Sequence, residues 1–173
     1  NESQRPRSIE SRTVNSISSL QVGVAGPSAW VRIDGRDTFQ NSAGLKEFAT
    51  EMMRRGHREF VVDLAACELM DSTFLGTLTG IALGLPPGGK LTVVRANDRN
   101  RAVMQNLGLD RIFAVEESAP APAPGRMEDA ETNPPQMARR ETIIQAHENL
   151  VAANPANAIR FKDVLEFLQQ KAP

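Results

Sequence analysis

The chain has 173 residues, a length that allows one domain with appendages. Its 20 basic and 21 acidic side chains nearly cancel and are dispersed, which excludes a nucleic-acid or membrane surface that depends on bulk charge. One cysteine, Cys67, excludes an intramolecular disulfide, and the longest largely apolar stretch, 74–85, is short of the roughly 20 residues that span a bilayer. We therefore expect a cytoplasmic protein with no nucleic-acid or membrane partner.

Four zones of different composition follow one another along the chain. Residues 1–16 are rich in serine and arginine and lack apolar periodicity, which predicts a disordered N-terminal arm. Residues 17–116 carry strand and helix patterns and form the expected domain. Residues 117–135 contain alternating alanine and proline, which favours extended polyproline II and predicts a semi-rigid linker. Residues 136–173 are expected to form a helical hairpin.

The domain begins with two apolar segments, 20–24 and 30–33, which predict strands on either side of a turn. Apolar residues at helical spacing come next, with Ser42 as the expected N-cap and Gly56 as the C-cap. The remaining elements are a buried strand over 60–64, a helix over 73–85, a strand over 90–94, a helix over 98–107 and a short strand over 113–115. This alternation predicts an α/β fold with a mostly parallel sheet.

The most informative stretch is 70–76, Met-Asp-Ser-Thr-Phe-Leu-Gly, where a buried strand gives way to a helix. It places Ser72 and Thr73 at the start of that helix, where backbone N–H groups are unpaired and the dipole favours negative charge. A hydroxyl group at this position is either a helix cap or a phosphate acceptor.

This order of strand, short acidic loop and Asp-Ser-Thr-x-Leu-Gly resembles the phosphorylation loop of anti-sigma-factor antagonists, small bacterial proteins with the STAS fold. The resemblance covers residues 19–116. It implies a STAS fold with a mostly parallel sheet of four to five strands and helices on one face. The C-terminal helical hairpin is an addition to that fold.

The resemblance also implies roles for single residues. Thr73, two positions before Leu75, matches the phosphoacceptor, and Ser72 is the second choice. Thr38 stands in the loop 35–41 where the family usually has aspartate, so either Asp37 replaces it or this contact is absent. At position 74 the family commonly has a small residue, whereas this chain has Phe74. The Phe74 ring either covers the acceptor or contacts a partner. The expected partner-binding residues are Asp37, Thr38, Asp71, Ser72 and Phe74.

The function that the resemblance implies is a phosphorylation-switched binding protein. It would sequester an anti-sigma factor with serine kinase activity and so regulate sigma-factor-dependent transcription, and a serine/threonine phosphatase is a second candidate partner. A phosphate in the interface would eject the partner without refolding the domain. The alternative is a STAS adaptor or scaffold module of a signalling assembly or transport system, in which Thr73 is structural.

No constellation that supports catalysis is visible in the sequence. Metal-ligand spacing, a nucleophile elbow, a glycine-rich phosphate loop and paired carboxylates are all missing from it. We therefore expect no enzymatic activity, no catalytic residue, no metal and no cofactor. Gly76, Gly80 and Gly84 form a smooth stripe on one helix, which we interpret as tight packing on the sheet in preference to a partner groove.

Two apolar stripes at helical spacing predict the hairpin, with Asn154-Pro155 between them. Neither helix can bury its stripe alone, so the stripes pack on the domain or bind another chain, including a second copy of this one. The first stripe comprises Met137, Ile144, Ala146 or His147, Leu150 and Val151, and the second comprises Ile159, Phe161, Val164, Leu165 and Leu168.

Overall fold

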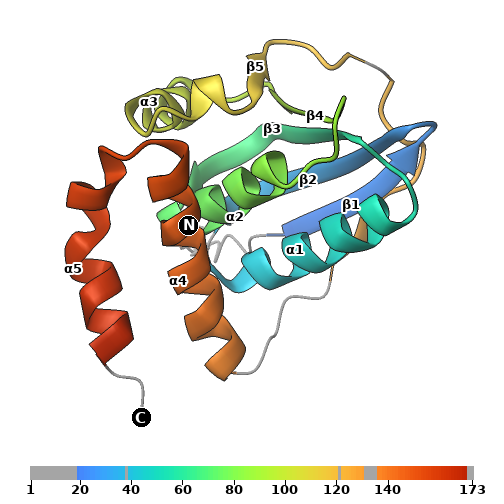
Figure 1. Ribbon diagram of the computed structural model, residues 1–173. Coiled ribbons are helices and arrows are strands. Elements are labelled where there is room, and N and C mark those ends of the chain that lie inside the picture. Colours follow the sequence, from blue (N-terminus) through green and yellow to red (C-terminus); the bar gives the residue numbers. More distant parts are fainter. Residues whose placement is uncertain (1–18, 38, 121, 131–135, 171–173) are drawn as a thin grey trace, which may run out of the picture.

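The computed structural model describes residues 19–37, 39–120, 122–130 and 136–170, so the expected N-terminal arm and Thr38 lie outside the described residues. Strands and helices alternate along the domain, and two helices follow (Figure 1). In chain order they are β1 Ser19–Ala25, β2 Ser28–Asp37, α1 Phe39–Arg54, β3 Glu59–Met70, α2 Ser72–Leu83, β4 Lys90–Val94, α3 Asp98–Asn106, the 3-10 turn Leu109–Arg111, β5 Ala114–Glu116, β6 Glu128–Asp129, α4 Gln136–Ala153 and α5 Asn157–Gln170.

The strands form one sheet in the order β5-β4-β3-β2-β1-β6. β2, β3, β4 and β5 are parallel neighbours, whereas β1 runs antiparallel to both β2 and β6. The expected α/β fold with a mostly parallel sheet is confirmed. The sheet has six strands instead of four or five because β6 joins its outer edge.

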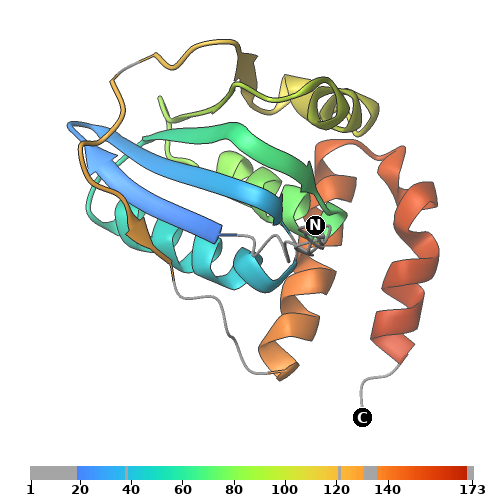
Figure 2. The same cartoon turned by 180° about the vertical axis from the view of Figure 1, so that it is seen from behind.

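Alternating side chains along β3 divide the sheet into two faces. Phe60, Val62 and Leu64 belong to the large core beneath α1 and α2, whereas Val61 packs with Trp30 on the opposite face. Figures 1 and 2 show α1 and α2 against one face, and the segment after β5 supplies Ala119 and Met127 to the small cluster on the other. A strand whose two faces are both covered reads as a nearly continuous apolar run, as 60–64 does. The carboxyl end of β3 therefore leads directly from the core into α2.

The first helix differs from expectation at its start and agrees with it at its end. α1 begins at Phe39, so Ser42 lies inside the helix, is buried and is not the N-cap. Gly56 has a φ of +94°, the left-handed conformation that favours glycine after a helix. The N–H group of His57 donates to the carbonyl oxygen of Met52 at 2.9 Å, which completes the helix end.

Near the end of α1, two arginines bind one carboxylate on the surface. Arg54 Nε and Arg55 Nε each donate to Glu51 at 2.9 Å, and the hydrogen bond from Arg54 is the first cause that lowers the pKa of Glu51 from 4.5 to about 2. Since this pKa lies below its unfolded value, the stabilisation is full above about pH 4.5 and is lost as the pH falls towards 2. In an NMR titration, Arg54→Gln should raise the pKa of Glu51 towards 4.5. A Glu51 carboxyl that titrates near 4.5 in the parent would contradict this.

Part of the segment after β5 is fastened to the sheet, so over residues 122–130 the chain is not the semi-rigid linker that the sequence predicts. β6 pairs with β1 through Gln21 and Val22, and the N–H group of Ala130 donates to the carbonyl oxygen of Leu20 at 2.9 Å. Met127 packs over the small apolar cluster on the open face. An edge strand offers unpaired backbone groups, and the chain pairs with them once its prolines have passed.

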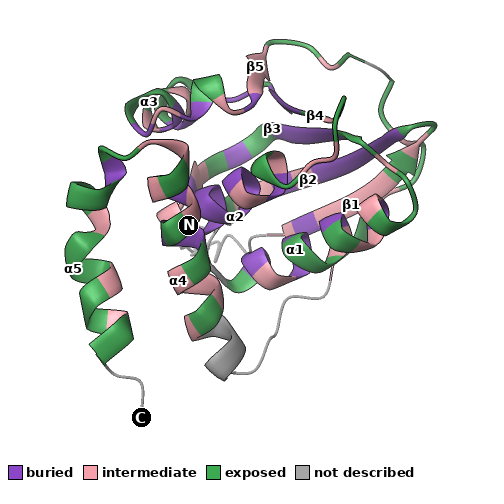
Figure 3. Ribbon diagram, viewed as in Figure 1, coloured by how far each residue is buried: buried purple, intermediate pink, exposed green. Residues whose placement is uncertain are grey.

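The two C-terminal helices are confirmed, and they differ in burial (Figure 3). On α4, Ala146, His147 and Leu150 are buried, and Leu150 belongs to the core of the domain. On α5, Ile159 is 86% exposed. The described side chains of the first apolar stripe therefore include those that pack on the domain, and Met137 lies outside them. In the second stripe Phe161 packs against the core, whereas Ile159 and Val164 are exposed. No helix among the described residues is long and apolar enough to cross a bilayer.

Candidate functional site

The start of α2 is capped by Asp71. Its backbone is extended, with φ −81° and ψ 169°, and its Oδ1 accepts a hydrogen bond from the N–H group of Phe74 at 2.8 Å. Ser72 is the first residue of the helix, so the interpretation that Ser72 or Thr73 caps α2 is wrong. Because Asp71 is the cap, the hydroxyl groups of Ser72 and Thr73 have no capping role. Both lie at the N-terminal end of α2, which favours negative charge.

Ser72 is half-buried and is hydrogen-bonded to a residue of the hairpin. Its Oγ lies 2.9 Å from His147 Nε2, and His147 Nδ1 lies 2.7 Å from the carbonyl oxygen of Ile143. Because a carbonyl oxygen can only accept, Nδ1 carries a proton, and in the neutral imidazole Nε2 is then the acceptor for the Ser72 hydroxyl. The imidazole is 3% exposed, and the ring of Phe161 stands edge-on to it at 4.9 Å. The hairpin thus holds the side chain next to the expected acceptor.

Thr73 and Phe74 are less accessible than the motif suggested. Thr73 is 6% exposed, and its carbonyl oxygen accepts a hydrogen bond from Thr77 Oγ1 at 2.9 Å. Phe74 is 0% exposed and belongs to the large core. Its ring offers no surface to a partner in this conformation, which argues against the expected contact role.

The first expected contact loop and the start of α2 meet at one edge of the sheet. Asp37 at the end of β2 pairs in register with Met70 at the end of β3, the residue before Asp71. The carboxyl ends of parallel strands commonly carry the functional loops of α/β proteins. The structure therefore brings the backbone at the end of β2 beside the strand end that leads into the hydroxyl motif.

Two members of the glycine stripe, Gly76 and Gly80, face α4 and not the sheet, which corrects our interpretation of them, while Gly84 meets only the backbone of α2. A Cβ atom on Gly76 would overlap the backbone of Ala146, and one on Gly80 would overlap the side chain of Asn149. Asn149 Nδ2 also donates to the carbonyl oxygen of Gly76 at 3.2 Å. The absence of two side chains lets α4 approach the backbone of α2 closely.

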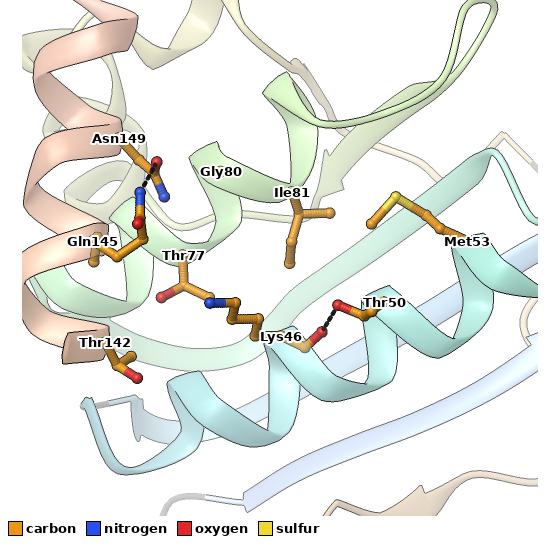
Figure 4. Close-up of a pocket in the computed structure, with 10 residues that line it drawn as sticks. Lys46, Thr50, Met53, Thr77, Gly80, Ile81, Thr142, Gln145 and Asn149 are labelled. Atoms are coloured by element: carbon orange, nitrogen blue, oxygen red, sulfur yellow. Dashed lines mark hydrogen bonds between the residues drawn. The ribbon is translucent and has the colours of Figure 1, made fainter. Parts of the chain in front are cut away.

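A cavity of about 240 Å³ remains where α4 diverges from α1 and α2 (Figure 4). Lys46 points towards Thr77 across it, and Gln145 Nε2 donates to Asn149 Oδ1 at 3.1 Å along its α4 side. The seam between hairpin and domain is consequently incompletely filled at this end, where polar side chains of α4 lie near the apolar side chains of Met53 and Ile81. The lining residues are Lys46, Thr50, Met53, Thr77, Gly80, Ile81, Thr142, Gln145, Ala146 and Asn149.

Two residues of this site were missed by reasoning from the sequence: His147 as the partner of Ser72, and Asn149 as the partner of Gly76. The spacing of Gly76 and Gly80 was the available signal, since two glycines one turn apart suit the close approach of another helix. Among the described residues, no group of three or more histidine, cysteine or carboxylate side chains is placed to hold a metal ion.

Comparisons with known proteins agree with this fold. An anti-sigma factor antagonist from Mycobacterium paratuberculosis is similar, with 19% identity and a TM-score of 0.54 over 60% of this chain and 89% of that one. The anti-sigma factor antagonist SpoIIAA in its unphosphorylated form matches with 15% identity and a TM-score of 0.50 over 58% of this chain and 89% of that one. At these identities the likeness shows a shared fold.

Curated protein sequences give no significant match to the chain. A family model does match it. The model is described as the MlaB STAS domain, and it aligns with residues 20–116, more than half of the sequence. Its bounds start within β1 and end with β5, so that β6, α4 and α5 lie outside the match. The chain therefore belongs to the STAS-domain family, and carries a C-terminal helical hairpin in addition.

Proposed function

We propose that this protein is an anti-sigma-factor antagonist whose binding is switched by phosphorylation at the start of α2. It captures an anti-sigma factor with serine kinase activity and thereby frees a sigma factor for transcription. Thr73 is the proposed acceptor, with Ser72 as the second choice. The observation that supports this most is the cap by Asp71, which leaves two hydroxyl groups at a helix N-terminus with no capping task.

A phosphate at this position would suit the domain and disfavour a complex. It carries about −1.5 to −2 charges, which the N-terminal end of α2 stabilises when the group is exposed to water. A docked partner would remove that water and strengthen the repulsion between the phosphate and the neighbouring carboxylate of Asp71. Burying a charge without a partner is costly, so the partner dissociates while the fold persists. The protein acts by binding and has no turnover of its own.

Labelling with the cognate kinase tests the acceptor. The full chain is incubated with anti-sigma factors of the serine-kinase class from the same organism and radiolabelled ATP, and the labelled peptide is mapped by mass spectrometry. We expect the label on Thr73, so that Thr73→Ala loses it, keeps binding and resists release. Thr73→Glu should weaken binding by about tenfold or more, because it places a charge in the interface.

Ser72→Ala is the matched control, since it removes the neighbouring hydroxyl group and should retain the label. A label that follows Ser72 instead would identify the second choice as the acceptor. Label outside both residues, or a Thr73→Glu protein that binds as tightly as the parent, would contradict the proposed switch.

A STAS adaptor or scaffold module is the second candidate function, and the burial of Thr73 favours it. A side chain that is 6% exposed is a poor kinase substrate in this conformation. In that case Thr73 is structural, and the outward face of α5 supplies the contact with a signalling assembly or a transport system. The kinase experiment separates the two functions, since an adaptor would bind its partner without becoming labelled.

A further inference from the structure

The contact between α4 and α2 covers the surface on which the proposed function depends. We propose that α4 is a built-in competitor: it occupies the α2 face around Ser72, Gly76 and Gly80 in the free protein, and the partner presents a helix that takes its place. This inference rests on the proposed function and adds a level of regulation to it. Binding and phosphorylation then both require α4 to leave.

The way in which α4 sits on α2 defines what else can bind there. Ala146 meets Gly76 backbone to backbone, and Asn149 lies over Gly80 while donating to the carbonyl oxygen of Gly76. A helix fits this face only if it carries a small residue opposite Gly76. A side-chain amide three positions later would satisfy the same carbonyl oxygen. The partner helix should therefore share the small-x-x-amide pattern of Ala146 and Asn149.

The same contact shields the acceptor. The Ser72 hydroxyl is held by the buried ring of His147, and Thr73 is almost completely covered. A kinase must bring the phosphorus atom of ATP to the hydroxyl oxygen, and a side chain that is 6% exposed leaves no such approach. A phosphate added at this start of α2 would be poorly solvated while His147 of α4 holds the neighbouring Ser72, at a large cost in free energy. Docking of α4 and phosphorylation are therefore mutually exclusive.

The seam on the side of the cavity is suited to opening. Thr142, Gln145 and Asn149 line it with polar groups, and the 240 Å³ cavity separates them from Lys46 and Thr77. Incompletely packed contacts of mixed polarity between parts of one chain resemble transient interfaces more than a core. Water can replace these contacts at little cost when α4 moves away.

The other end of α4 is anchored more firmly. Leu150 is fully buried in the core, and Asn157 Nδ2 donates to the carbonyl oxygens of Leu107 at 3.0 Å and Leu150 at 2.8 Å. The hairpin is thus held where α4 meets α5. The opening that we propose is a movement of the part of α4 that precedes Leu150, while the domain stays folded.

A reporter thiol in the full chain measures this opening without any partner. Thr77→Cys places the thiol on α2 at the cavity, where α4 restricts access to a bulky maleimide. Ala146→Glu then adds a charged side chain at the contact with Gly76. Ala152→Glu introduces the same change at an exposed position of α4 and is the matched control. Cys67 is buried in the core, so its labelling reports global unfolding.

We expect Ala146→Glu to speed labelling at position 77 by about tenfold or more, as when a competent state rises from a minor population to most of the molecules. Ala152→Glu should leave the rate within about twofold of the parent, and Cys67 should stay unlabelled in all variants. Thr73→Glu, which mimics the phosphate, should also raise the rate at which maleimide labels the thiol at position 77. Unchanged labelling in Ala146→Glu, or labelling of Cys67 at the same pace, would overturn the proposal.

A binding measurement with the anti-sigma factor that labels the parent completes the test. The competitor model predicts that Ala146→Glu binds it about tenfold or more tightly than Ala152→Glu does. Equal affinity of the two variants would refute the competition while leaving the proposed function intact. Failure of both variants to bind would instead contradict the proposed function, and the competition with it.

Discussion

Phe74→Ala is expected to lower the free energy of unfolding by about 3–5 kcal/mol, the usual cost of removing a fully buried aromatic ring. The side chain is 0% exposed and belongs to the core beneath α1 and α2. Truncation removes its transfer free energy and leaves a cavity that the surrounding strands and helices cannot fill by relaxing. Urea unfolding followed by circular dichroism measures the loss.

Phe167→Ala on α5 makes the same change at a side chain that is 56% exposed, and it should cost less than about 1 kcal/mol. The comparison decides between the two roles considered for Phe74. If Phe74→Ala kept the unfolding midpoint of the parent and lost affinity for the anti-sigma factor, the ring would be a contact residue exposed in solution, and the described position would be wrong.

Gly76→Ala should destabilise the protein by about 1–3 kcal/mol, the typical cost of overpacking. The sign of this change in stability is informative, because helix propensity alone predicts that Gly76→Ala stabilises the protein by about 1 kcal/mol. The added methyl group overlaps the backbone of Ala146, which cannot rotate away as the end of a side chain could. Thermal and urea unfolding of the full chain give the change in free energy.

Gly84→Ala serves as the control for this substitution. Gly84 follows the last turn of α2 with a negative φ of −89° and lies away from α4, so alanine there should change stability by no more than about 0.5 kcal/mol. A stabilised Gly76→Ala protein would mean that α4 does not lie against α2 in solution.

Local patterns predicted the elements of the domain well. β4 was expected over 90–94 and occupies Lys90–Val94, because an apolar run after a Pro-Gly turn is typical of a buried strand. The helix cap was harder to assign, since Asp71, Ser72 and Thr73 are all good capping residues. Only the register of the first helical turn shows that Asp71 accepts from the N–H group of Phe74.

The features that the sequence did not reveal are contacts between distant segments. β6 consists of Glu128 and Asp129, two acidic residues without a strand pattern, and it forms because β1 offers an unpaired edge. The hydrogen bond between Ser72 and His147 joins residues from different zones. Gly76 carried a signal for close packing, yet the identity of the packed element depended on where the hairpin folds back.

The pairing of β6 with β1 has a consequence for any molecule that binds α2. With Ala130 hydrogen-bonded to Leu20 at the sheet edge, α4 begins only six positions later at Gln136, and each residue spans at most about 3.6 Å. This short connection at one end and the anchor at Leu150 at the other keep the displaced part of α4 near its site, at an effective concentration on the order of millimolar. A partner present at micromolar levels must therefore bind α2 far more strongly than α4 does. Loss of the pairing between β6 and β1 would lengthen the connection to α4 and so lower the affinity that a partner needs in order to displace α4.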